Sequence, residues 1–284
     1  MQKNRMFNEE TLLSLLNKIS KQQFEVPPDI EPFELIKEVC RHLGNPNPVL
    51  RDELGYSLLA EWIYKKKTLN HQQLRELYSI MVSNHMWFCR IGEINTDSVF
   101  MRSFTSLGIT LLLLVDIDTP FLTIEEWEIL LERTVVYCTL EKDLRGYVEE
   151  NGWLHAAAHA ADVLNAFAKH PNFSVNHTRF ILTAINKVME NALDVFRHEE
   201  DERLARAIAN LIENKHLPLE ELITWFEQAN IDFEPYIVRM TKRINWKHLL
   251  RSCISQLTKR KLLTDSMDKS VLTTFNNLFD SPYI

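Results

Sequence analysis

Glycine is scarce in this sequence, and its scarcity excludes the commonest nucleotide-binding loops. The 284 residues include only 6 glycines, at positions 44, 55, 92, 108, 146 and 152, and these never form GxGxxG or GxxxxGK[ST]. Such loops need clustered glycines because backbone N–H groups must approach the phosphates closely. The serine-nucleophile motif GxSxG is also missing. The sequence therefore gives no support to a P-loop, a dinucleotide fingerprint or a serine-hydrolase elbow.

Cysteine is also sparse, and its distribution argues against an exported protein. Cys40, Cys89, Cys138 and Cys253 lie more than forty residues apart and form no CxxC. A disulfide framework or a cysteine-rich zinc site would need closer spacing. The N-terminal stretch 1–19 lacks the apolar core of a signal peptide and is predicted to be an amphipathic helix. We expect reduced, buried thiols and a cytoplasmic location.

Long apolar runs and excess positive charge are missing too. The longest apolar run, 107–115, has nine residues, about half of the ~20 that cross a bilayer, so no transmembrane segment is expected. The formal net charge of −7 disfavours a general role in coating nucleic acid, whose phosphates are bound mainly by clustered Lys and Arg.

The residues that are present predict a single all-α domain over 1–284, with about twelve helices. Hydrophobic residues at 45% and charged residues at 25% are close to globular averages. Apolar residues recur at three- and four-residue spacing, as in Leu12, Leu13, Leu16 and Ile19, while alternation of period two is missing. Thr123 and Glu126 form a capping box before one such helix.

Four segments form a weak repeat, which predicts a HEAT-like array. "PVLRDELGYSLLAEWI", "SVFMRSFTSLGITLLL", "GWLHAAAHAADVLNAF" and "DERLARAIANLI" align with register positions 48 to 53 residues apart. A HEAT-like helix pair takes about 40–47 residues, so the spacing is slightly long. We expect a curved stack of helix pairs with these segments as inner helices, whose equivalent positions line one concave surface. The predicted ligand-binding residues are Arg51, Asp52, Arg102, Arg145, Trp153, Asp162, Glu202 and Arg203. The alternative is that these charged residues cap helices and stay solvated.

The stretch "GWLHAAAHAADVL" at 152–164 carries the strongest candidate chemistry. At 100° per residue, His155, His159 and Asp162 share one helical face, while the alanines supply a packing face. Two imidazoles at i and i+4 with a carboxylate one turn later can bind a divalent transition metal. No cofactor is predicted beyond that metal, whose fourth ligand would come from a distant residue such as Glu202 or Asp143. Without a metal, His155 and His159 are candidate catalytic acid–base residues, with Arg145 holding an anionic group. A merely solvated face is the third interpretation.

The segments "LEKDLRGYVEENGWLHAAAHAADVL", "LRDELGYSLL" and "DERLARAI" resemble a bacterial family, the domain of unknown function 2785, over about residues 30–260. The shared pattern RGY…GWxHxxAHxAD corresponds here to Arg145, Gly146, Gly152, Trp153, His155, His159 and Asp162. The resemblance implies a cytosolic, all-helical protein and supports a common site, and it implies no reaction.

A basic amphipathic region, 237–279, lies near the C-terminus. Its 237–263 part has no acidic residue and carries Arg239, Lys242, Arg243, Lys247, Arg251, Lys259, Arg260 and Lys261. Trp246, Leu249, Leu250, Cys253, Ile254 and Leu257 form an apolar stripe at helical spacing. The stripe favours a terminal helix that caps the stack, and the alternative is contact with nucleic acid, a membrane or an acidic partner.

Three functions follow from these patterns. The favoured one is a helical-repeat protein whose polar groove binds a peptide, a protein partner or a small anionic ligand. The second is an enzyme that uses His155 and His159, with or without a metal, on an anionic substrate. The third is a nucleic-acid-associated protein that uses the basic C-terminal segment. The sequence leaves the oligomeric state and the ligand open.

Overall fold

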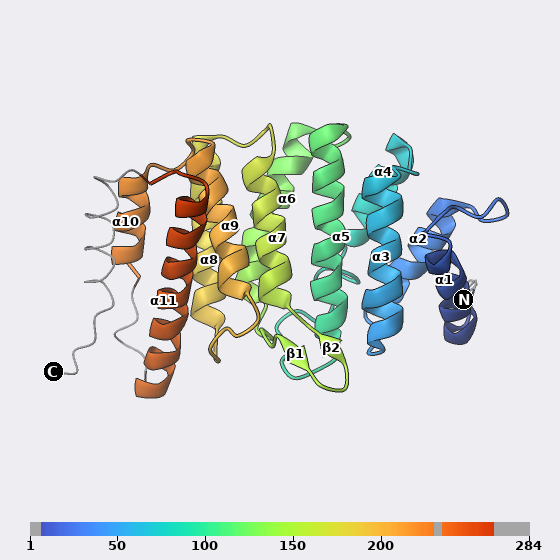
Figure 1. Ribbon diagram of the computed structural model, residues 1–284, viewed down its shortest axis with the longest axis horizontal. Coiled ribbons are helices and arrows are strands. Elements are labelled where there is room, and N and C mark those ends of the chain that lie inside the picture. Colours follow the sequence, from blue (N-terminus) through green and yellow to red (C-terminus); the bar gives the residue numbers. More distant parts are fainter. Residues whose placement is uncertain (1–6, 230–234, 264–284) are drawn as a thin grey trace.

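The protein is an elongated row of helices in the computed structural model, which describes residues 7–229 and 235–263 (Figure 1). The first helix lies at one end of the row and the last two helices lie at the other (Figure 1). The α-helices are α1 (Glu9–Lys21), α2 (Pro32–Arg41), α3 (Ser57–Leu59), α4 (His71–Met81), α5 (Ser98–Asp118), α6 (Ile124–Leu140), α7 (Ala156–Lys169), α8 (Thr178–Asn191), α9 (Glu200–Glu213), α10 (Leu219–Glu227) and α11 (Tyr236–Lys259). The predicted all-α class is thus confirmed at the level of helix content.

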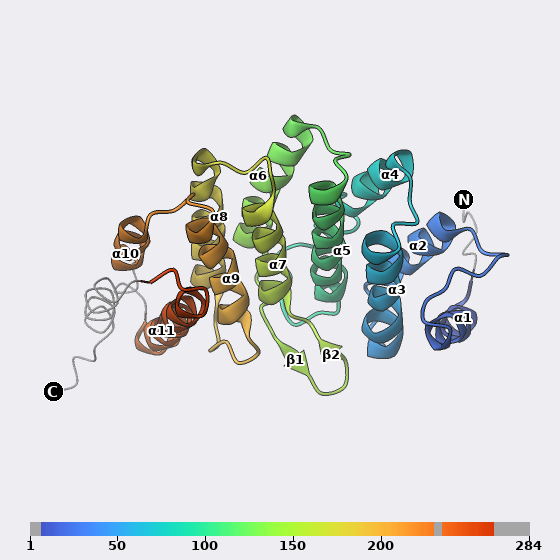
Figure 2. The ribbon, with the colours of Figure 1, turned by 45° about the horizontal axis from the view of Figure 1, so that its top comes forward.

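The helices form two rows, and the four aligned segments of the repeat lie side by side in one of them. Helices α3, α5, α7, α9 and α11 stand side by side, with α6 and α8 packed together behind them (Figures 1 and 2). The four aligned segments correspond to the helix around α3, to α5, to α7 with the strand and turn before it, and to α9. Each is packed against the next, so their side chains can meet across neighbouring helices. The predicted capping box is present, because Glu126 N–H donates to Thr123 Oγ1 at 3.1 Å and starts α6.

Helix α5 is the core helix of the row. Among the described helices it alone is long and apolar enough to cross a bilayer, and 83% of that window is buried inside the protein, as in a soluble protein's core. Near its end, Asp116 accepts hydrogen bonds from the backbone N–H groups of Phe121 and Leu122 and from His170 Nε2–H. Burial alone would raise the pKa of Asp116, but these three donors outweigh burial and lower it.

The helix around α3 is π-helical on both sides, over Val49–Tyr56 and Ala60–Lys65. The wider π turn is rare and often found at functional sites. Gly55 lies in the first π segment, where an added Cβ would be 2.6 Å from the Leu50 carbonyl oxygen. No residue pattern indicates this distortion, because the apolar spacing of the segment is that of an ordinary helix.

A short hairpin joins α6 to α7 and is the only strand pair in the described residues. Strands β1 (Tyr147–Val148) and β2 (Gly152–Trp153) pair antiparallel. Gly152 has a φ of +76°, a conformation that favours glycine. Its surroundings favour glycine too, because an added Cβ would lie only 3.0 Å from the Cβ of Pro48. The hairpin brings Trp153 and the start of α7 against the α3 region.

The basic C-terminal segment forms a helix that packs on the array. In α11 the stripe residues Trp246, Leu249, Leu250, Cys253 and Leu257 are buried and Ile254 is half-buried. The helix contacts α9, where Arg260 pairs with Glu213 at 2.7 Å and Ser252 donates to Asp201 at 2.6 Å. These contacts agree with the predicted terminal helix that caps the stack. Positions 264–279 of the predicted basic region lie outside the described residues.

Candidate functional site

A cavity of about 600 Å³ opens between the α3 region, α7 and α9. Pockets of roughly 300–1,000 Å³ are the usual size for small-molecule sites. Its lining contains six predicted site residues, namely Asp52, Trp153, His155, His159, Asp162 and Arg203, together with Tyr56, Leu107, Arg197, His198 and Glu199. Residues from widely separated parts of the chain therefore meet in one cavity.

His155 does not lie inside α7, as its spacing predicted, but immediately before it. Its backbone is left-handed, with φ of 50°, and its N–H donates to the Arg145 carbonyl at 3.2 Å. Glu199, which lines the same cavity, precedes α9 with φ of 65°. Such conformations cost on the order of 1–3 kcal/mol for residues other than glycine, and they cluster at functional sites. Both helices at the cavity thus begin from a strained residue.

The His155 ring is buried without a hydrogen-bond partner at one nitrogen. The residue is 6% exposed, and its Nε2 has no partner among the described residues. The ring packs on Trp153, with centroids 4.3 Å apart, and lies 5.6 Å from the ring of His159. An unpaired buried nitrogen is costly and calls for a ligand, a water or an ion.

His159 is held in one tautomer by Ser103 of α5. The Ser103 hydroxyl donates to the Leu154 carbonyl, so its oxygen can only accept from the His159 ring. The Ser103 carbonyl lies 3.2 Å from His159 Nδ1 and also accepts. The proton is therefore on Nδ1, which leaves Nε2 as a bare acceptor in a ring that lines the cavity.

The cavity keeps His155 and His159 neutral at pH 7. Burial, followed by the nearby charge of Arg203, lowers the pKa of His155 to about 4. Burial also lowers the pKa of His159 well below its usual value, and the neighbouring His155 adds to the effect. Both rings can then accept hydrogen bonds or bind cations, because neither carries a proton on every nitrogen.

Asp162 and Arg203 supply paired charges to the same cavity. Arg203 Nη1 donates to Asp162 Oδ2 at 2.8 Å, while Arg203 Nε is buried without a partner among the described residues. Burial raises the pKa of Asp162, an effect that Arg203 opposes. Burial, with Asp162 nearby, raises the pKa of Tyr56 to about 12, so its phenol is a neutral donor. The lining therefore offers donors, acceptors and both signs of charge.

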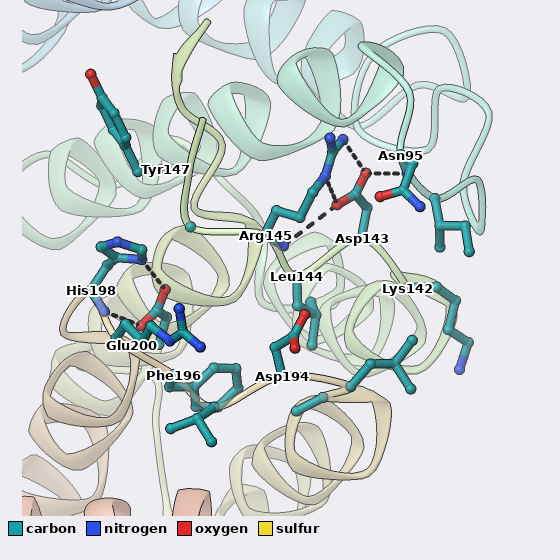
Figure 3. A pocket seen from close by; sticks show the side chains of 16 residues that line it. Asn95, Lys142, Asp143, Leu144, Arg145, Tyr147, Asp194, Phe196, His198 and Glu200 are labelled. Atoms are coloured by element: carbon teal, nitrogen blue, oxygen red, sulfur yellow. Dashed lines mark hydrogen bonds and ion pairs between the residues drawn. The ribbon is translucent and has the colours of Figure 1, made fainter. Parts of the chain in front are cut away.

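A second cavity of about 350 Å³ shares Arg197 and His198 with the first. Figure 3 shows it, with Asp143 and Arg145 on one side and His198 and Glu200 on another. Arg145, a predicted anion holder, pairs with Asp143 at 2.6 Å and donates to the Thr96 carbonyl. We call the two adjoining cavities the polar groove.

Three predicted ligand-binding residues lie elsewhere. Arg51 is fully buried and donates to the carbonyls of Asn151 and Trp153, with its guanidinium 3.9 Å from the Phe100 ring. Arg51 therefore binds the β1–β2 hairpin to the α3 region. Arg102 is fully buried in an ion pair with Glu141. Glu202 is exposed and lines neither cavity. The expectation that these side chains line one cleft was wrong, because the two arginines point into the protein toward partners that the repeat pattern does not reveal.

The structure also changes the candidate metal ligands. In the described residues the group with metal-ligand spacing is His155, His198 and Glu200, whose donor atoms all lie within 4.8 Å of one another. The predicted trio of His155, His159 and Asp162 is not such a group in the described residues, and the carboxylate of Asp162 is paired with Arg203. The stretch "RHEED" at 197–201 carries the missed residues, and its only signal was a histidine among acids directly before a helix.

Comparison with known proteins identifies a family and nothing more specific. A family model described as a protein of unknown function (DUF2785) matches residues 87–255, more than half of the chain, so the chain belongs to this family. The matched range includes every lining residue of the polar groove except Asp52 and Tyr56. No curated protein and no solved structure matches the chain.

Proposed function

We propose that this member of the DUF2785 family is a binding protein whose polar groove takes a small ligand with an anionic group. The observation that carries the proposal is the cavity of about 600 Å³ in which two buried polar atoms, His155 Nε2 and Arg203 Nε, have no partner among the described residues. Buried polar groups in native proteins are nearly always paired, so a ligand that supplies their partners accounts for both.

The anionic group is proposed from the positive charges of the groove. Arg197 is exposed, lines both cavities and has no ion pair within the described residues. Arg203 keeps an unpaired N–H beside the Asp162 contact. Arginine binds carboxylates and phosphates with up to two parallel hydrogen bonds, which suits this role better than lysine.

We also propose that the array is HEAT-like and that the protein is bacterial and cytoplasmic. The support for the repeat is that neighbouring helices of one row correspond to the aligned segments, with a second row behind them. Four free cysteines, of which three are buried, agree with a reducing compartment. The ends of such arrays are closed by capping helices, a role that fits α11 and disfavours nucleic-acid binding through its basic face.

Acid–base catalysis fits the groove less well than binding. A general base works best with a pKa near the working pH. The pKa of His155 is about 4 and that of His159 is also lowered, so both hold a proton weakly at pH 7. Peptide or protein partners would have to insert a side chain, since the cavities have the size of small-molecule sites.

The proposal is tested by calorimetric titration with inorganic phosphate, acetate and succinate at low salt. Arg197→Met should weaken the best of these ligands by about 10- to 100-fold, because one charge-assisted hydrogen bond contributes roughly 1.5–3 kcal/mol. The matched control is Arg179→Met, which removes an exposed arginine outside both cavities. Absence of binding by all three probes, or equal losses in both variants, would contradict an anion site in the groove.

A further inference from the structure

The two cavities meet at a cluster of three potential metal ligands. His155 lines the larger cavity, Glu200 lines the smaller one, and His198 lines both. His155 precedes α7, His198 lies in the connection from α8 to α9, and Glu200 is the first residue of α9. One ligand atom from each lies within 4.8 Å of the others. His198 and Glu200 are seen side by side in Figure 3.

Glu200 is a buried acid without a strong cationic partner. It is 2% exposed, and its carboxylate accepts the backbone N–H of His198 at 2.8 Å. Its ion-pair contact in the described residues is with His198 Nδ1 at 3.8 Å, and no lysine or arginine pairs with it there. A carboxylate removed from water is costly unless a cation compensates it. This position is therefore prepared for a positive charge.

The two histidines add an unpartnered nitrogen and a ring that packs against a glycine. His155 is more than nine-tenths buried, and its Nε2 has no hydrogen-bond partner in the described part of the chain. The His198 ring lies directly on Gly146, where an added Cβ would be only 2.1 Å from Nδ1. Gly146 thus acts as a positioning residue, since any side chain there would displace the ring from Glu200.

We propose that His155, His198 and Glu200 bind one divalent transition metal ion with the ligand preference of zinc. Two imidazoles and one carboxylate are a known ligand set for sites that keep a position open. Zinc bonds of about 2.0–2.2 Å place tetrahedral ligand atoms roughly 3.3 Å apart, so binding would draw these atoms together by about an ångström. Half-exposed His198 has the freedom to move.

The open position would face the polar groove and accept an oxygen of the ligand. A metal at this junction lies between the two cavities, beside the residues that they share. This inference goes beyond the proposed function, because the ion would then be the partner of His155 Nε2 and Arg203 Nε would be left for the anionic ligand. It does not depend on the proposed function, because metal binding can occur without an organic ligand.

The test is a zinc titration of full-length protein that has been stripped with a chelator. Affinity is measured by competition with a chromogenic chelator, and the melting temperature is followed as a second readout. We expect one zinc per chain and a rise in melting temperature with zinc concentration. Gly146→Ala should weaken zinc by about 10- to 100-fold, as the loss of a ligand-orienting residue does. His198→Ala and Glu200→Gln, which remove ligands, should weaken it further.

Two controls separate this site from adventitious binding. His71→Ala removes an exposed histidine outside both cavities and should leave zinc affinity unchanged. Arg197→Met should weaken the anionic probes without lowering zinc stoichiometry, so failure of the anion site and failure of the metal site give different results. Glu200→Gln keeps an oxygen for the His198 N–H and is expected to fold. If Glu200→Gln does not fold, the zinc affinity of Gly146→Ala is the deciding measurement.

Absence of stoichiometric zinc in the wild type would overturn the proposal. So would wild-type affinity in both Gly146→Ala and Glu200→Gln, or a loss of zinc in His71→Ala equal to that in His198→Ala.

Discussion

Replacing Arg102 with methionine is expected to lower the free energy of unfolding by about 3–5 kcal/mol, the usual cost of breaking a buried ion pair by removing one partner. Both side chains are buried, and Arg102 donates to the two oxygens of Glu141 at 2.5 and 2.9 Å. It also donates to Ser98 Oγ at 2.8 Å and to the Cys89 carbonyl at 3.0 Å. The variant leaves the Glu141 carboxyl group buried without its cation, and these acceptors without a donor.

The magnitude is measured by urea unfolding followed by far-UV circular dichroism. A double-mutant cycle with Glu141→Gln isolates the pair, and we expect the double variant to be less destabilised than the sum of the single changes by roughly 2–3 kcal/mol. Arg102→Met that remains folded should bind the anionic probes as the wild type does. Additivity within about 0.5 kcal/mol, or a selective loss of anion binding without a loss of stability, would refute a structural role for Arg102.

Three further changes test the supports of the fold. Because the pKa of Asp116 is lowered, its stabilisation is complete above its ordinary value of about 4 and disappears as pH falls through the folded-state pKa. Asp116→Asn should therefore lower the free energy of unfolding in urea by about 1–2 kcal/mol at pH 7 and by much less near pH 2; an equal loss at both pH values would contradict this. Gly55→Ala should cost about 1–3 kcal/mol in urea unfolding, because its Cβ meets a backbone oxygen at 2.6 Å. Arg51→Lys should cost at least ~2 kcal/mol in the same assay, because lysine cannot reach the carbonyls on both sides of the guanidinium, and wild-type stability would argue against the hairpin contact.

Local signals predicted the helices well. The spacing of apolar residues predicted α1 and α11, the aligned segments predicted α5, α7 and α9, and Thr123 with Glu126 marked the start of α6. Such features depend on residues within one or two turns of each other, so the order of residues alone reveals them. The same holds for His155, His159 and Asp162, which reach one cavity because a single segment carries all three.

The rest of the site depends on contacts between distant segments and on backbone strain. Nothing near Arg102 in the sequence indicates that its partner is Glu141, 39 residues away, so a buried structural arginine looked like a ligand-binding one. The left-handed residues His155 and Glu199 are unfavourable by local preference and are held by their surroundings. His198 was missed for that reason: only the packing of α9 beside α7 brings it to His155.

The position of the groove along the row has a consequence for how the molecule opens. In arrays whose helices contact mainly their neighbours, unfolding can begin at either end without involving the middle. The groove is built by the α3 region, α7 and α9, with at least one further helix on each side. Amide hydrogens of α1 and α11 should then exchange with deuterium well before those of α5 and α7. Fraying of the terminal helices would leave the groove intact, so its chemistry is placed where the array is slowest to come apart.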